Sequence, residues 1–172
     1  MTRQGKNKTW VLTALLSALT CVATMVLVIP SPSGGYMNLG DAVVLLGACL
    51  LGPVYGAVAG GIGAALADLL AGFPMYVPAT LLIKAGMGVL AGCLYRKLRG
   101  KPWAVAVCGV AAECVMVVGY WLYDGFLMGS LAGSAVGIPA NLTQAVFGVA
   151  AAALMVPALK KSRYVCNLFP HL

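Results

Sequence analysis

The stretch Tyr36–Leu70 reads YMNLGDAVVLLGACLLGPVYGAVAGGIGAALADLL and decides how the chain folds. It contains two apolar segments that meet at the corner Gly52-Pro53. Small residues recur at every fourth position from this corner, and residues four apart lie on one face of a helix. Such a ridge lets another helix approach closely within lipid, because no side chain holds the backbones apart. The ridge consists of Gly52, Gly56, Gly60 and Ala64, and it ends on Asp68.

Asp68 is the charged residue of the otherwise apolar second segment. A carboxylate that faced lipid would cost several kcal/mol, so we expect Asp68 to face the protein interior or a wet cavity. The stretch therefore predicts a tightly packed helical bundle with a polar spot at one end.

The composition of the whole chain is that of an integral membrane protein. Of its 172 residues, 62% are apolar and only 9% are charged, and the mean hydropathy is +0.97. A water-soluble domain of this size carries more polar surface than this. The net charge of +7 does not indicate nucleic-acid binding, because the basic residues form three short clusters between apolar segments. We predict one all-α membrane domain over residues 1–172, located in the cell membrane as a multi-pass protein.

The apolar segments predict six transmembrane helices in a compact bundle. The second segment holds 13 residues and spans only about 20 Å, less than the hydrocarbon core. Either the bilayer thins there, or the preceding loop Gly34–Asn38 dips into the bundle as a lid or wall of a pocket. We favour the loop, because irregular backbone at that depth lines protein or a water-filled cavity. The expected helices cover approximately residues 9–29, 39–51, 53–71, 77–98, 102–123 and 134–159.

The basic clusters predict the orientation of these helices. They lie before the first helix, between the fourth and fifth, and after the sixth, and five or seven helices would split them. With six helices all three fall on one side, so the positive-inside rule places both termini in the cytoplasm. The outer half then holds most polar side chains of the helices, which predicts an outward-facing pocket with a closed floor rather than a pore. These side chains are Asp41, Asp68, Lys84, Asn141 and Gln144.

Each charged residue in the helices has a structural interpretation beside a functional one. Asp41 lies three residues after Asn38, which favours a helix-capping acid over a ligand contact. Asp68 and Lys84 either pair with each other or contact a ligand, since buried charges need partners in both cases. Glu113 has no evident basic partner except Lys84, and it is either a protonated structural acid or a ligand contact.

Neutral polar and aromatic residues complete the candidate site. Asn141 and Gln144 form hydrogen bonds without the cost of a buried charge, and we expect at least one of them to contact a ligand. Tyr120 has the commoner role of an interface aromatic as its alternative, whereas Tyr36 suits stacking on a flat ring. The set expected at the ligand is Tyr36, Asn38, Lys84, Glu113, Tyr120, Asn141 and Gln144, with Asp41 and Asp68 as structural polar residues.

The sequence offers little for catalysis or metal binding. None of the six cysteines forms a CxxC pair, and His171 is the single histidine, next to the end of the chain. The expected helices carry no paired residues at catalytic spacing, which disfavours an intramembrane enzyme. We predict no catalytic residue, no metal ligand and no cofactor. A free-standing small carrier or channel remains an alternative, although no inverted repeat is evident.

Several motifs resemble the substrate-binding S components of energy-coupling factor (ECF) vitamin transporters. The matching pieces are Asn38-Leu-Gly-Asp41, Gly52-Pro53, the run from Gly56 to Asp68, and Thr80-Leu-Leu-Ile-Lys84. The resemblance covers most of the chain and is greatest for the riboflavin-transporter-like branch. That branch also includes proteins assigned to hydroxymethylpyrimidine, pyridoxine and cobalamin, so the shared framework does not identify the vitamin.

The resemblance implies a mode of action and a set of partners. Such S components bind a vitamin on the outer side, and the first outer loop closes over it. They dock on a membrane scaffold, the T component, which works with two ATPase subunits, and they topple to release the ligand inside. The pair Ala14 and Ala18 corresponds to the surface that contacts the T component. The chain has no GxxxxGK[ST] motif, which agrees with ATP hydrolysis by partner subunits.

The distribution of arginines limits the ligand. All four arginines fall at the predicted cytoplasmic side, so no arginine cluster is available to hold a phosphate. We expect a small neutral or weakly charged ring compound, pyridoxine-like or hydroxymethylpyrimidine-like, in preference to a flavin phosphate. Riboflavin and cobalamin remain alternatives.

Overall fold

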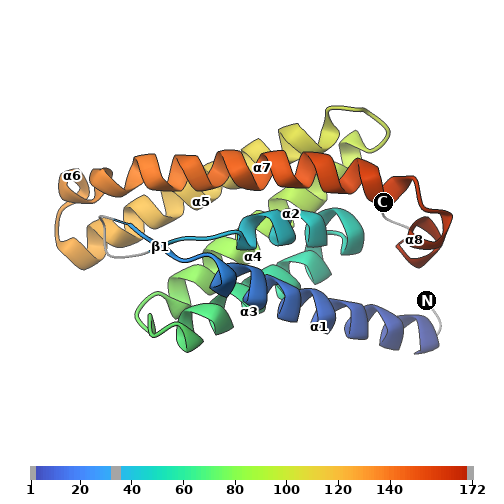
Figure 1. Cartoon of the computed structure of the whole chain (residues 1–172), viewed down its shortest axis with the longest axis horizontal. Helices are drawn as coiled ribbons and strands as arrows, with labels where there is room; N and C mark the ends of the chain where they lie inside the picture. The colour runs from blue at the N-terminus through green and yellow to red at the C-terminus, as the bar shows by residue number, and fades with distance from the viewer. Residues whose placement is uncertain (1–2, 32–35, 170–172) are drawn as a thin grey trace.

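Apolar helices make up most of the computed structural model, which describes residues 3–31 and 36–169 (Figure 1). Two short strands and a 3-10 helix interrupt the helical pattern. The elements in chain order are α1 (Arg3–Val26), β1 (Ile29–Pro30), β2 (Tyr36–Met37), α2 (Gly40–Leu51), α3 (Pro53–Leu70), α4 (Val77–Leu98), α5 (Ala104–Met128), α6 (Leu131–Ser134), η1 (Ala135–Gly137), α7 (Ile138–Lys160) and α8 (Arg163–Leu168).

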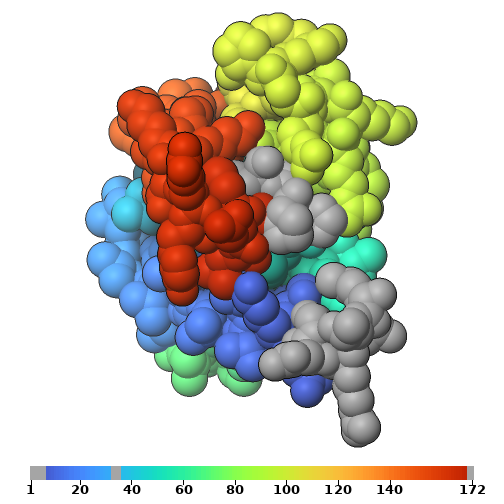
Figure 2. Space-filling model, turned by 90° about the vertical axis from the view of Figure 1, so that its right-hand side faces the viewer, coloured from blue at the N-terminus to red at the C-terminus, as the bar shows by residue number. Residues whose placement is uncertain are grey.

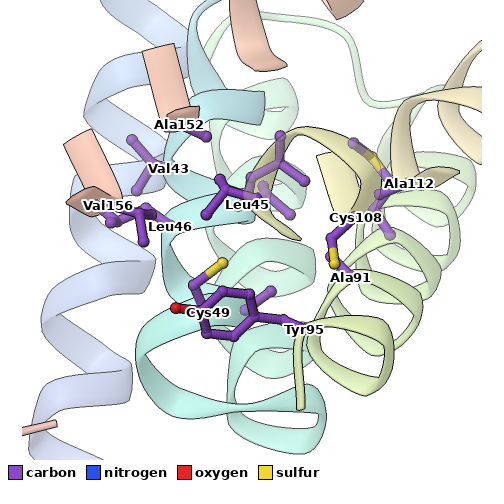
Figure 3. Close-up of a cluster of buried hydrophobic side chains, with 14 of the residues drawn as sticks. Val43, Leu45, Leu46, Cys49, Ala91, Tyr95, Cys108, Ala112, Ala152 and Val156 are labelled. Atoms are coloured by element: carbon purple, nitrogen blue, oxygen red, sulfur yellow. The ribbon is translucent and has the colours of Figure 1, made fainter. Parts of the chain in front are cut away.

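Helix α2 forms the centre of the bundle. All 12 of its residues are buried, and it packs against α1, α3, α4 and α7. Its sequence GDAVVLLGACLL is apolar on all sides after the first turn, as expected for a helix surrounded by protein. Figure 3 shows part of the resulting core, in which Leu45, Leu46 and Cys49 of α2 lie among side chains of α4, α5 and α7.

The small-residue ridge predicted on α3 is confirmed as a close-packing face. Gly52 turns the chain between α2 and α3 with φ at +82°, a left-handed conformation that favours glycine. A Cβ atom at Gly56 would lie 2.6 Å from the Ala48 Cα atom, and one at Gly60 would lie 2.8 Å from a Val44 methyl group. The backbones of α2 and α3 therefore approach too closely for any residue larger than glycine at positions 56 and 60.

Helix α4 also packs closely through glycine residues, against another side of α3. A Cβ atom at Gly88 would lie 2.7 Å from the Ala57 Cα atom, and one at Gly92 would lie 2.6 Å from the Pro53 Cα atom. These glycines belong to the row at spacing four that also contains Thr80 and Lys84. The close approach brings the Lys84 side chain into the interior of the bundle, where it is 1% exposed.

Five helical segments are long and apolar enough to cross a membrane, among the described residues. Helix α2 is the shorter apolar helix and spans about 18 Å. The six predicted apolar helices are thus all present as helices, and length and composition support spanning for five of them. The five candidate spans are Asn7–Val26, Pro53–Leu70, Val77–Leu98, Ala104–Met128 and Leu131–Lys160.

Some element boundaries differ from the prediction for local reasons. Helix α1 ends at Val26 rather than near residue 29, because Ile29 and Pro30 pair antiparallel with Met37 and Tyr36. Helix α5 continues to Met128 rather than ending near residue 123, and Gly129 ends it with φ at +65°. Residues 124–128, expected in a loop, therefore belong to a helix.

Both termini lie at one end of the bundle, together with the α4–α5 connection (Figures 1 and 2). Four basic residues at the end of α4 and just after it, Arg96, Lys97, Arg99 and Lys101, lie at the same end as three around the α7–α8 connection, Lys160, Lys161 and Arg163. This grouping is what the positive-inside rule requires of a cytoplasmic face. The cytoplasmic location of the termini itself stays a prediction.

Substitution of two glycines on α4 separates close packing from helix propensity. We expect Gly88→Ala to lower the thermal unfolding midpoint of the detergent-solubilised protein, since overpacking costs about 1–3 kcal/mol. Gly86→Ala is the matched control, because a Cβ atom there meets its nearest neighbour, a Val115 methyl group, at 3.8 Å. Alanine favours a helix over glycine by roughly 1 kcal/mol, so Gly86→Ala should keep or raise the midpoint. Equal midpoints for both variants would contradict the packing argument.

A polar pocket at the end opposite the termini

The β1–β2 hairpin lies toward the end of the bundle away from the two termini (Figure 1). A pocket opens there, lined by the hairpin and by residues near the ends of four helices. Its volume is about 390 Å³ with the mouth included. The hairpin and its link to α2 contribute three residues, α3 one, α4 and the residue before it two, α5 two and α7 two. The lining residues are Ser31, Tyr36, Asn38, Asp68, Tyr76, Thr80, Tyr120, Asp124, Asn141 and Gln144.

Two hydrogen bonds hold the hairpin against the pocket. The Tyr36 hydroxyl donates to Asp68 Oδ1 at 2.6 Å, and its ring packs on Phe73 with the ring centroids 4.9 Å apart. The backbone N–H of Asn38 donates to Gln144 Oε1 at 2.7 Å. Burial and the nearby Asp68 carboxylate raise the pKa of Tyr36 well above its usual value, so its hydroxyl remains a donor at physiological pH. The hairpin is thereby linked to both α3 and α7.

The predicted lid Gly34–Asn38 is described only in part. Residues 32–35 lie outside the described residues, while Tyr36 and Asn38 line the pocket as predicted. The Asn38 side chain accepts a hydrogen bond from the Gly40 backbone N–H at 2.8 Å, which closes the turn into α2.

The opposite wall consists of paired aromatic and polar side chains from α4 and α5. The Tyr76 hydroxyl donates to Asp124 Oδ1 at 2.8 Å, and the Thr80 and Tyr120 hydroxyls share a hydrogen bond at 2.9 Å. Tyr76 and Thr80 lie four residues apart, as do Tyr120 and Asp124, so each pair occupies one helix face. Burial and the neighbouring Asp124 raise the pKa of Tyr76, which keeps this hydroxyl protonated as well.

A buried ion pair lies beneath the pocket. Lys84 on α4 donates to Asp41 Oδ1 on α2, and the Gln144 amide of α7 donates to Asp41 Oδ2. The Lys84 ammonium also lies 5.3 Å from the centre of the Tyr120 ring. Gln144 therefore connects the pocket with the ion pair, since it lines the pocket and also donates a hydrogen bond to Asp41.

Glu113 lies next to this ion pair but does not line the pocket. A Cβ atom on Gly148 would approach both Glu113 Oε1 and Asp41 Cβ, at 2.6 and 3.1 Å, so the two acids are neighbours. Glu113 is buried, and neither of its oxygens accepts a hydrogen bond from the described residues. It borders an apolar groove between α5 and α7 instead.

The structure brings five of the seven predicted ligand residues to the pocket and leaves two beneath it. Tyr36, Asn38, Tyr120, Asn141 and Gln144 line the pocket, whereas Lys84 and Glu113 do not.

The capping role predicted for Asp41 is wrong, because Asp41 makes no capping bond and instead bonds to Lys84 and Gln144. Of the two alternatives for Asp68, an ion pair with Lys84 is not formed among the described residues, since Lys84 pairs with Asp41 and Asp68 accepts from Tyr36. The prediction missed Asp68 as a lining residue, together with Ser31, Tyr76, Thr80 and Asp124. The i, i+4 spacing of Tyr76 with Thr80, and of Asp124 with the predicted Tyr120, was a usable signal for three of the missed residues.

Ala14 and Ala18 lie on the exposed face of α1. The residues of α1 that face the bundle are Thr13, Leu16, Thr20 and Thr24, which are buried. The AxxxA pair is therefore available to a partner rather than used in internal packing.

Removal of one member of the buried ion pair should destabilise the protein strongly. We expect Lys84→Met to leave the Asp41 carboxylate unpaired beside Glu113, at a cost of about 3–5 kcal/mol, and Asp41→Asn to leave Lys84 unpaired. The measurement is thermal unfolding in detergent of both single variants and of the double variant. The double variant should be more stable than the sum of the single effects implies, and strict additivity would show that the two groups do not interact.

Comparisons with known proteins agree with this architecture. The family model described as ECF-type riboflavin transporter, S component, matches residues 5–161. The thiamine precursor transporter HmpT of Lactococcus lactis subsp. cremoris (strain MG1363) is 32% identical over 162 residues, which are 92% of each chain. A protein of Pyrococcus woesei described as "Uncharacterized protein in gap 3′region" is 38% identical over 129 residues, 74% of this chain and 85% of the relative.

Two solved structures share the fold. The S component of a bacterial ECF transporter superposes with a TM-score of 0.73 at 22% identity, over 91% of this chain and 97% of that one. The S component for biotin from an ECF-type ABC transporter superposes with a TM-score of 0.71 at 19% identity, over 94% and 95%. The chain thus belongs to the ECF-type riboflavin transporter S component family, and it is a membrane-integral subunit for vitamin uptake rather than an enzyme.

Proposed function

We propose that this chain captures hydroxymethylpyrimidine, or a ring compound very similar to it, on the outer side of the cell membrane. It then delivers the ligand to the cytoplasm together with an ECF T component and two ATPase subunits. The observation that carries the proposal is the chemistry of the pocket lining. Among the described residues, the lining contains two carboxylates, three tyrosines and three amide side chains, and no lysine, arginine or histidine.

The charge of the lining favours a ligand that donates hydrogen bonds. Asp68 and Asp124 are acceptors when ionised, and the nearest buried cation, Lys84, is already paired with Asp41. A phosphate ester would meet two carboxylates and no cation, which disfavours pyridoxine phosphate and flavin phosphates. An amino-substituted ring with a hydroxymethyl group supplies N–H and O–H donors, and the two carboxylates can accept hydrogen bonds from them.

The space inside the pocket does not choose between the vitamins of the family. Its interior has room for only about 30 Å³, well below the roughly 300–1,000 Å³ of small-molecule sites, so the lining must move apart to admit any of these ligands. A single-ring vitamin needs less of this movement than riboflavin or cobalamin. Between pyridoxine and hydroxymethylpyrimidine, the relative named as a thiamine precursor transporter supports the pyrimidine.

The closed floor favours a transport subunit that depends on partners over a free-standing channel. The ion pair and the apolar core of α2, α4, α5 and α7 fill the bundle below the pocket. Within the described part of the chain, these groups block a straight path from the pocket through the bundle. The positive cluster at the other end supports the outward direction of the pocket mouth.

The ligand proposal predicts an order of affinities. Purified protein in detergent should bind hydroxymethylpyrimidine most tightly, pyridoxine more weakly, and riboflavin and cobalamin least in an isothermal titration. Pyridoxine phosphate should bind at least about tenfold more weakly than pyridoxine, because its phosphate meets carboxylates without a cation. Tighter binding of the phosphate ester than of the parent alcohol would overturn the charge argument, and riboflavin as the tightest ligand would overturn the proposed vitamin.

The partner proposal predicts separate effects on uptake and binding. Ala14→Leu and Ala18→Leu should abolish vitamin uptake by cells while the purified variants bind ligand normally, because bulk on the exposed α1 face keeps a partner helix away. Ala150→Leu is the control, an exposed alanine on α7. Equal loss of binding and uptake in the α1 variants would show that the pair has an internal role instead.

A further inference from the structure

Asp68 has one oxygen without a partner, and the side chain lines the pocket. The residue is 4% exposed, its Oδ1 atom accepts from Tyr36, and its Oδ2 atom accepts no hydrogen bond. The other buried side-chain atoms without partners among the described residues belong to Tyr95 and Glu113, and neither of these lines the pocket. Asp68 Oδ2 is therefore the unsatisfied acceptor of this site in the described part of the chain.

No described residue donates a hydrogen bond to this oxygen in the structure. Tyr36 is bonded to Oδ1, and Lys84 is paired with Asp41. Thr80 lies beside Asp68, and its hydroxyl shares a hydrogen bond with Tyr120 in which either group can be the donor. Buried acceptors in folded proteins are almost always satisfied, and an unsatisfied carboxylate oxygen destabilises the protein. A donor on a molecule in the pocket would satisfy Oδ2.

We propose that Asp68 selects the ligand, its Oδ2 atom accepting an N–H from an amino group on the ligand ring while its Oδ1 atom keeps the Tyr36 hydroxyl. This inference rests on the proposed function, and it names the feature of the substrate that is recognised. One carboxylate then joins the ligand and the hairpin, since Tyr36 belongs to β2. The ligand class is a nitrogen heteroaromatic with an amino or aminomethyl substituent, and a ring without that group leaves Oδ2 unsatisfied.

The Tyr36 bond makes Asp68→Asn an informative variant. The Tyr36 hydroxyl donates a hydrogen bond at this position, so the asparagine should orient its amide oxygen toward Tyr36. The amide NH₂ group then faces the pocket, where it opposes a ligand amino group instead of accepting from it. The substitution therefore reverses the hydrogen-bonding character of this position with little change in size.

The experiment measures ratios of affinity for two matched ligand pairs by calorimetry. The first pair is hydroxymethylpyrimidine and its analogue without the ring amino group, and the second is pyridoxamine and deoxypyridoxine. We expect the wild-type protein to prefer the amino member of at least one pair by about ten- to a hundredfold. Asp68→Asn should bring that ratio close to one. The ratio of the affinities of one variant for the two ligands does not depend on the fraction of that variant that is folded, so a loss of folded protein cannot imitate the expected result.

Two other variants serve as controls. Tyr36→Phe removes the donor to Oδ1, so it should weaken both members of a pair and preserve the ratio. Asp124→Asn changes the second carboxylate of the pocket, whose Oδ1 atom is bonded to Tyr76, and it should also preserve the ratio.

The outcomes separate this inference from the proposed function. An unchanged ratio in Asp68→Asn, or a ratio lost in Asp124→Asn instead, overturns the role of Asp68 even where hydroxymethylpyrimidine binds tightly. A preference for pyridoxamine that depends on Asp68, without pyrimidine binding, supports the inference and overturns the proposed vitamin. Binding of none of the four compounds to the wild-type protein overturns both.

Discussion

The ion pair between Lys84 and Asp41 is the interaction on which the rest of the structure depends. Both side chains are almost completely buried within the bundle, where an unpaired charge is expensive. The pair forms only if α2 and α4 lie side by side, and Gln144 satisfies the second Asp41 oxygen only if α7 lies against them. Three helices that carry little other polar chemistry are thereby fixed in one arrangement.

The ion pair also marks the boundary between a close-packed apolar half of the bundle and a polar half that contains the pocket. Below it, α2 packs on all sides through small and apolar residues, since lipid provides no hydrophobic force that would drive helices together. Above it, polar side chains at the ends of α3, α4, α5 and α7 surround a space closed by the hairpin. Gln144 connects the halves, because it bonds to Asp41 below and to the Asn38 backbone above. A ligand contact in the pocket is thus one hydrogen bond away from the core.

Local patterns made the fold largely predictable. The ridge Gly52, Gly56, Gly60 and Ala64 needs only helical periodicity to be recognised, and it packs closely in the structure. The boundaries of α5 and the hairpin were less predictable. Continuation of α5 to Met128 depends on contacts that hold Asp124 and Tyr76 together, and the pairing of Ile29 with Met37 depends on where the chain returns.

The sequence by itself determined that the chain is a membrane bundle, which faces are close-packed, and that polar residues gather toward one end. These properties follow from composition and from spacing along single helices. The tertiary structure alone decided the partners of the acids: Lys84 with Asp41 rather than Asp68, Tyr36 with Asp68, and Tyr76 with Asp124. The physical reason is that a buried charge needs some partner wherever it lies, while the identity of that partner depends on which helices are neighbours and at what depth.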